Sequence, residues 1–204
     1  MELDYHYAGF WKRLCSGIID ALVLLPLVLL FYWGYSQSRS IALLLTLPLS
    51  IYFSFYVLYF HARWGQTIGK MVMKIKVLRV DGTSIGWKES LLRHSIDLLF
   101  STLQTVGQFI ALLAISDAVF SAGHVNGLFS KENMEFQETL IKMDPMPSWL
   151  LIASNVWVWS ELFFLLLNKQ KRALHDLIAG TIVVCGKPDG SGQFVPEKIP
   201  AEPI

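Results

Sequence analysis

The chain has 204 residues, of which 53% are hydrophobic and 16% are charged, and its formal net charge is +1 at pH 7. A soluble domain carries about 25% charged residues, well above this chain's share. A disordered chain needs low hydrophobicity and high charge, so this composition excludes one. The two cysteines exclude a disulfide scaffold. The balance of 17 basic and 16 acidic residues excludes a nucleic-acid binder that acts through overall positive charge.

Four stretches of the chain are long and apolar enough to cross a lipid bilayer, which takes about 20 mostly apolar residues. The sequence therefore predicts an all-α membrane protein, a four-span transmembrane helical bundle; the alternative is buried helices in a soluble protein. We expect residues 1–186 to form the transmembrane domain and residues 187–204, with four of the eight prolines, to form a flexible cytoplasmic tail. The expected spans are about residues 14–35, 41–60, 95–116 and 149–167.

The basic residues are divided unevenly among the expected loops. Fourteen of the 17 Lys and Arg residues lie before the first span, between spans two and three, or after span four. The positive-inside rule then places both termini and the middle loop in the cytoplasm, and the loop at residues 117–148 outside. Within this outer loop we expect a surface helix that Ser130 caps, with Phe136, Leu140 and Met143 on one face.

The loop between spans two and three contains two motifs. Residues 65–70, Gly-Gln-Thr-Ile-Gly-Lys, are similar to a phosphate-binding loop, but three residues separate the glycines where that loop needs four. Met71 also stands where a Ser or Thr would hold magnesium, so we exclude nucleotide binding and expect a tight turn. Asp81-Gly82 lies between β-prone runs and predicts a small amphipathic β-hairpin against the cytoplasmic leaflet; a solvated basic loop is the alternative.

Polar and charged side chains recur on one face of three of the expected spans. An ionisable group in a span costs roughly 2.5–3.5 kcal/mol, so it usually faces the bundle interior and has a partner. In one interpretation the acids form a polar pathway that binds or relays a cation or protons. In the other they form structural ion pairs, Arg13 with Asp20 and Arg93 with Asp97. The residues concerned are Arg13 and Asp20 in the first span, Arg93, Asp97, Gln104 and Gln108 in the third, and Glu161 in the fourth.

Two further acidic residues, Glu161 and Asp176, lie in or after the fourth span. Glu161 has no basic residue close to it in sequence, which favours a functional role or a protonated carboxyl. His175-Asp176 follows span four, where we expect a short basic helix that docks against the other cytoplasmic ends. A metal site would need further ligands at helical spacing, and the remaining histidines are scattered. We expect no metal, no cofactor and no enzymatic activity.

Several of these motifs together resemble the RDD family of membrane proteins. The run from Ala8 to Arg13 that leads to Asp20 resembles the start of the family's domain, and the run from Ala173 to Thr181 resembles its closing motif. The resemblance covers about residues 8–184. Its middle-loop and closing positions here are Gly65, Thr67, Gly69, Lys70, Val77, Asp81, Gly82, Arg93 and His175.

This resemblance implies a bacterial inner-membrane protein, and it assigns the arginine and two aspartates for which the family is named to Arg13, Asp20 and Asp176. It also implies transport, since cation/proton antiport is attributed to some members. We expect a small transporter or transport component for a cation, protons or another small solute, with Asp20 as its central acid and a homo-oligomeric assembly. The alternative is an accessory or assembly protein that binds another membrane protein, with the intramembrane charges as structural ion pairs.

Overall fold

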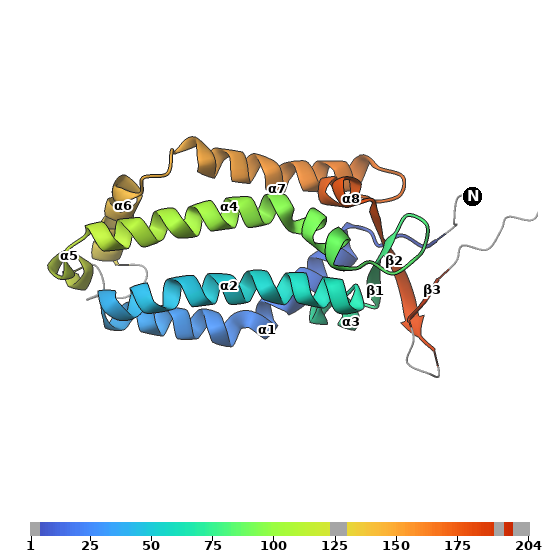
Figure 1. Cartoon of the computed structure of the whole chain (residues 1–204), viewed down its shortest axis with the longest axis horizontal. Coiled ribbons are helices and arrows are strands. Elements are labelled where there is room, and N and C mark those ends of the chain that lie inside the picture. The colour runs from blue at the N-terminus through green and yellow to red at the C-terminus, as the bar shows by residue number, and fades with distance from the viewer. Residues whose placement is uncertain (1–4, 123–129, 190–193, 198–204) are drawn as a thin grey trace, which may run out of the picture. The chain divides into compact units, whose positions relative to one another are not determined.

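The computed structural model describes residues 5–122, 130–189 and 194–197 (Figure 1). Four of its helices are long and apolar enough to cross a membrane, which confirms the predicted all-α fold with four spans. Three of these helices begin earlier in the chain than expected, because polar first turns extend them. Their bounds are Phe10–Gln37 (α1), Arg39–Trp64 (α2), Trp87–Ala114 (α4) and Trp149–Leu167 (α7).

The shorter elements lie between and after these helices. Three of them form one small sheet with the strand order β1-β2-β3. Their bounds are Ile68–Val72 (α3), Ile75–Arg79 (β1), Asp117–Ala122 (α5), Lys131–Met143 (α6), Leu174–Ala179 (α8), Thr181–Pro188 (β2) and Phe194–Pro196 (β3).

The chain forms two compact units, and each long helix contributes to both. Unit 1 contains α3, α8 and the sheet, and Figure 1 shows α8 leading directly into β2. Unit 2 contains α5 and α6. Unit 1 comprises Met1–Val23, Phe55–Ser95 and Asn155–Ile204, and unit 2 comprises Leu24–Ser54 and Ile96–Ser154.

The sheet forms with a different strand partner from the one the sequence predicts. β1 pairs antiparallel with β2 from the C-terminal segment, and Arg79 lies opposite Thr181. The expected turn at Asp81-Gly82 is present, with the Arg79 amide donating to the Thr83 carbonyl at 2.9 Å. That turn leads only to a single bridge between Leu78 and Ser84, because the chain soon enters α4. The predicted hairpin is therefore short, and β2 completes the sheet.

Both faces of the central part of β2 are buried, as is usual for a run of apolar residues such as residues 182–185. One face carries Val77 and Val183 with Ala8, and the other carries Leu78 with Tyr5. The N-terminal segment also bonds to β2, since the Ala8 amide donates to the Val183 carbonyl at 2.8 Å. The start of α1 is thereby fixed to the C-terminal segment.

In unit 2, α6 confirms the helix expected in the outer loop. The Ser130 side chain accepts a hydrogen bond from the Asn133 amide at 3.1 Å, so it is the N-cap. Phe136 and Leu140 are buried as expected, whereas Met143 is 49% exposed because it is the last residue of the helix.

The segment expected to be a flexible tail is partly built into the sheet. β2 continues to Pro188 and pairs with β3, with Lys187 opposite Val195. The rest of the predicted tail, residues 190–193 and 198–204, lies outside the described residues.

Candidate functional site

Asp176 is the centre of a buried charge network in unit 1. It lies in the first turn of α8, where its carboxylate accepts a hydrogen bond from the Ala173 amide at 3.1 Å. Its side chain is fully buried. Arg13 donates to Oδ2 at 2.6 Å, and Arg93 forms an ion pair with Oδ1. Thr181 Oγ1 also lies 3.1 Å from Oδ1.

Two guanidinium groups therefore share one carboxylate. Burial alone would raise the pKa of Asp176, but the positive charges of Arg93 and Arg13 outweigh it and hold the pKa well below its ordinary value. Arg13 is fixed further by the Ala8 carbonyl at 3.1 Å and the Lys171 carbonyl at 2.5 Å. The carboxylate is ionised, and it joins the starts of α1, α4 and α8.

The expected pairing of Arg13 with Asp20 is replaced by this network. Arg13 and Asp20 lie two turns apart on α1, about 10 Å along the helix axis. Asp176 instead reaches Arg13 at the N-terminal end of α1. Arg93 likewise pairs with Asp176, while Asp97 is exposed on α4 and belongs to unit 2. Arg13 and Asp176, two of the three residues that the resemblance to the RDD family singles out, thus meet directly.

Asp20 has a different set of partners. Its carboxylate accepts hydrogen bonds from Tyr56 Oη at 2.8 Å, Thr67 Oγ1 at 2.6 Å and the Gly69 amide at 2.7 Å. These donors come from α2 and from the segment that starts α3, where Thr67 is the N-cap. Asp20 therefore anchors α3 to α1 and α2.

This anchoring explains the Gly65–Lys70 motif. Gly65 has a φ of 69°, which favours glycine and turns the chain away from the end of α2. Gly69 faces the Ser16 carbonyl of α1 so closely that a Cβ atom would overlap it. The predicted tight turn is present, and the motif holds α3 against α1.

Glu161 also has a partner that the sequence did not indicate. Its carboxylate contacts His175 Nδ1, and the His175 backbone amide donates to Glu161 Oε1 at 3.2 Å. His175 Nε2 lies 2.6 Å from an Arg93 guanidinium nitrogen. Burial and the charge of Arg93 keep the pKa of His175 well below its ordinary value. His175 lies 14 positions after Glu161, and sequence spacing does not reveal their contact because it forms only when the chain folds back after α7.

The expected polar stripe of α4 enters unit 2. Gln104 Nε2 donates to Ser154 Oγ at 3.1 Å, which is an interhelical hydrogen bond between α4 and α7. Gln104 and Gln108 also line a cavity of about 330 Å³. Among the described residues that line it, Asp144 is the one charged residue.

The position of Asp144 depends on close packing against α4. Its Oδ1 accepts a hydrogen bond from the Met146 amide at 2.8 Å. The loop lies against Gly107, where a Cβ atom would overlap the Asp144 carboxylate. No sequence motif pointed to Asp144, because the end of α6 brings it to Gln104 and Gln108 only in the folded chain.

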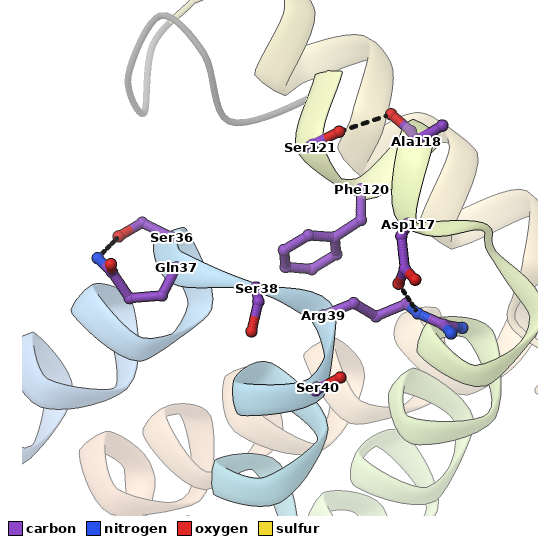
Figure 2. Close-up of a pocket in the computed structure, with 9 residues that line it drawn as sticks. All are labelled: Ser36, Gln37, Ser38, Arg39, Ser40, Asp117, Ala118, Phe120 and Ser121. Carbon is purple, nitrogen blue, oxygen red and sulfur yellow. Dashed lines mark hydrogen bonds and ion pairs between the residues drawn. The ribbon is translucent and has the colours of Figure 1, made fainter.

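A second cavity in unit 2, of about 550 Å³, lies where α1 ends and α5 begins. Figure 2 shows Arg39 and Asp117 pointing toward each other at its wall, with 2.6 Å between Arg39 Nε and Asp117 Oδ1. The same guanidinium donates to the Ile115 carbonyl at 2.7 Å and the Leu113 carbonyl at 3.2 Å. Arg39 thereby caps the C-terminal end of α4.

Comparison with known proteins relates most of the chain to one family. The uncharacterized protein YckC of Bacillus subtilis (strain 168) is 24% identical over 185 residues, which cover 90% of this chain and 88% of that protein. No solved structure matches. The sequence profile of the RDD family matches residues 7–180, which include the buried network around Asp176. The chain is therefore a multi-pass membrane protein that belongs to the RDD family.

Proposed function

We propose that this protein is a non-enzymatic transporter, or a component of one, for a small cationic solute exchanged against protons. The observation that carries the proposal is the 330 Å³ cavity in unit 2, which Gln104, Gln108 and Asp144 line. Its volume is within the range of small-molecule sites. One carboxylate with amide oxygens provides ligands for a cation, and the apolar side chains of Leu140 and Leu150 suit an organic cation.

This assignment moves the proposed ligand site away from the residues for which the family is named. Arg13 and Asp176 bind each other, and Asp20 accepts three hydrogen bonds. In the proposal these residues position the helices. Gln104 and Gln108, which the sequence suggested for a polar pathway, contact the solute together with Asp144.

The proposed location is the bacterial inner membrane, with both termini in the cytoplasm. The distribution of Lys and Arg supports this orientation. Single cysteines introduced by Ser36→Cys and Lys187→Cys, in a chain with Cys15 and Cys185 replaced, should react with an impermeant thiol reagent from opposite sides. Reaction from the same side would contradict the topology.

Because four spans are few for a transporter, we also propose a homo-oligomer, which native mass spectrometry would test.

The transport proposal is tested in phosphatidylethanolamine–phosphatidylglycerol vesicles with an acidic interior. Sodium, potassium or choline is added outside, and proton efflux is followed with a pH-sensitive dye. Wild type should exceed protein-free vesicles with at least one of these cations, and Asp144→Asn should lower the rate about tenfold. Asp117→Asn removes a carboxylate at the other cavity and serves as the matched control. Equal rates for wild type and Asp144→Asn would contradict the site, and no efflux from folded protein would contradict the function.

A second function, as an accessory protein that binds another membrane protein, is favoured by one observation. Arg13 and Arg93 both pair with the carboxylate of Asp176, as expected of structural ion pairs. Crosslinking in the native membrane followed by purification would identify a stoichiometric membrane-protein partner. Such a partner, together with absent cation-driven proton efflux, would favour this function.

A further inference from the structure

His61 and Lys70 form a close contact that the functions proposed above do not use. His61 is fully buried near the end of α2, and Lys70 is half-buried in α3. His61 Nδ1 lies 2.8 Å from the Val57 carbonyl oxygen. A carbonyl only accepts, so Nδ1 carries a hydrogen. His61 Nε2 then faces Lys70 Nζ at 2.9 Å.

This geometry limits the number of protons that the two side chains hold. A neutral imidazole with its hydrogen on Nδ1 presents a lone pair at Nε2, which accepts from Lys70. A protonated imidazole presents an N–H at Nε2, which requires a neutral Lys70 amine as the acceptor. Two positive charges with facing hydrogens do not fit at 2.9 Å. The pair therefore binds one excess proton or none.

We propose that His61 and Lys70 form a proton-binding site that exchanges a single proton with water through the Lys70 amine. His61 has no exposed surface, whereas Lys70 is partly exposed, so Lys70 is the side that water reaches. This site goes beyond the proposed transport of a cation, and its test does not depend on that transport.

Burial and the surrounding charges bring the pKa of Lys70 close to neutral pH, so its proton exchanges in that range. Burial lowers the pKa of Lys70, and the nearby Arg93 and Arg13 charges lower it further. Asp20 and Asp176 act in the opposite direction, and the resulting pKa is about 7. His94 and Arg93 of α4 also face His61. The groups involved thus come from α1, α2, α3, α4 and α8.

The proton also changes the charge balance of unit 1. Among the groups that act most strongly on Lys70 and Arg93, three cations face three carboxylates when Lys70 is protonated, and loss of the proton lowers the sum by one charge. These groups are Arg13, Lys70, Arg93, Asp20, Glu161 and Asp176.

The first experiment measures the proton affinity of Lys70 directly. The full chain in lipid nanodiscs is treated with trace acetic anhydride at pH values from 5 to 10, and each lysine peptide is quantified by mass spectrometry. Only the neutral amine reacts, so the pH midpoint reports the lysine pKa. We expect a midpoint near 7 for Lys70, about 3 pH units below that of an unperturbed lysine, which a free lysine peptide in the same sample reports. Equal midpoints, or a Lys70 that stays unreactive at every pH, would overturn the proposal.

The second experiment uses the pH dependence of unfolding. Between pH 7 and about 10 the unfolded chain binds a proton at Lys70 that the folded chain lacks, so stability rises with pH. The contribution of one proton raises the folding equilibrium constant up to about tenfold per pH unit. Lys70→Met should lose this contribution, and Lys88→Met should keep it. Identical pH slopes for wild type and Lys70→Met would overturn the site.

Discussion

The two units use polar residues in opposite ways. In unit 1 the polar groups are mostly charged, buried and paired with one another, as in the contacts of Asp176 with Arg13 and Arg93. In unit 2 the groups that line the cavities are mostly neutral amides and hydroxyls, and the charged groups among them are Asp144, Asp117 and Arg39. Paired charges fix the positions of helices, whereas neutral polar groups around a cavity remain able to bind a solute. In the proposed function, unit 1 holds the helices in place and unit 2 binds the solute.

The largest expected effect is on the buried network of unit 1. Asp176→Asn removes the carboxylate and leaves two buried guanidinium groups without their counter-charge, which costs about 3–5 kcal/mol of unfolding free energy. Titration with a denaturing detergent in mixed micelles measures the loss. Glu138→Gln, at an exposed pair with Lys142 on α6, should leave the free energy of unfolding nearly unchanged. A cost below about 1 kcal/mol for Asp176→Asn would contradict the stabilising role of the network around Asp176.

Acid should produce the same loss without a mutation. The arginines hold the pKa of Asp176 below its unfolded value, so its contribution to stability is complete above about pH 4 and falls as pH decreases through the folded pKa. Unfolding of wild type and Asp176→Asn is compared from pH 7 to pH 3. The stability difference between them should shrink toward the acid end. A constant difference across this range would show that protonation of Asp176 does not act on the network.

A smaller effect is expected where α3 packs on α1. Gly69→Ala places a methyl group on the Ser16 carbonyl and displaces the amide that bonds to Asp20, which costs about 1–3 kcal/mol. Gly17→Ala is the matched control, because nothing lies within 4 Å of its added Cβ and alanine favours a helix. Thermal unfolding in the same detergent should separate the two variants. Equal midpoints would contradict the close approach of α3 to α1.

The sequence predicted correctly the features that depend on one helix alone. Runs of about 20 apolar residues predicted all four spans, and the Ser130 cap predicted α6, since both features are local. The order of motifs around Arg13 and Asp176 also indicated the family.

The sequence was less informative where the partner comes from a distant segment. β1 pairs with β2, about 100 residues away, because the buried face of Val183 and Cys185 offers a larger apolar surface than the few residues before α4. The contact of Glu161 with His175 and the place of Asp144 at the cavity likewise depend on how the chain returns. Helical spacing places residues on a shared face, and it does not reveal which other helix meets that face.

The smallest expected effect is at the end of α4 in unit 2. Arg39→Gln removes the donors to the Ile115 and Leu113 carbonyls, which have no partner within the helix, and costs about 1 kcal/mol. Unfolding in mixed micelles should detect this loss.

The ion pair of Arg39 with Asp117 separates capping from charge pairing. Asp117 is 79% exposed, so Asp117→Asn should cost less than about 0.5 kcal/mol, and added salt should remove even that cost. The loss in Arg39→Gln should persist in salt, because the backbone carbonyls remain without donors. If Asp117→Asn proved as costly as Arg39→Gln, the pair with Asp117 and not the helix end would be the main contact of Arg39. Unit 2 would then depend on paired charge as unit 1 does, and the contrast between the units would narrow to their cavities.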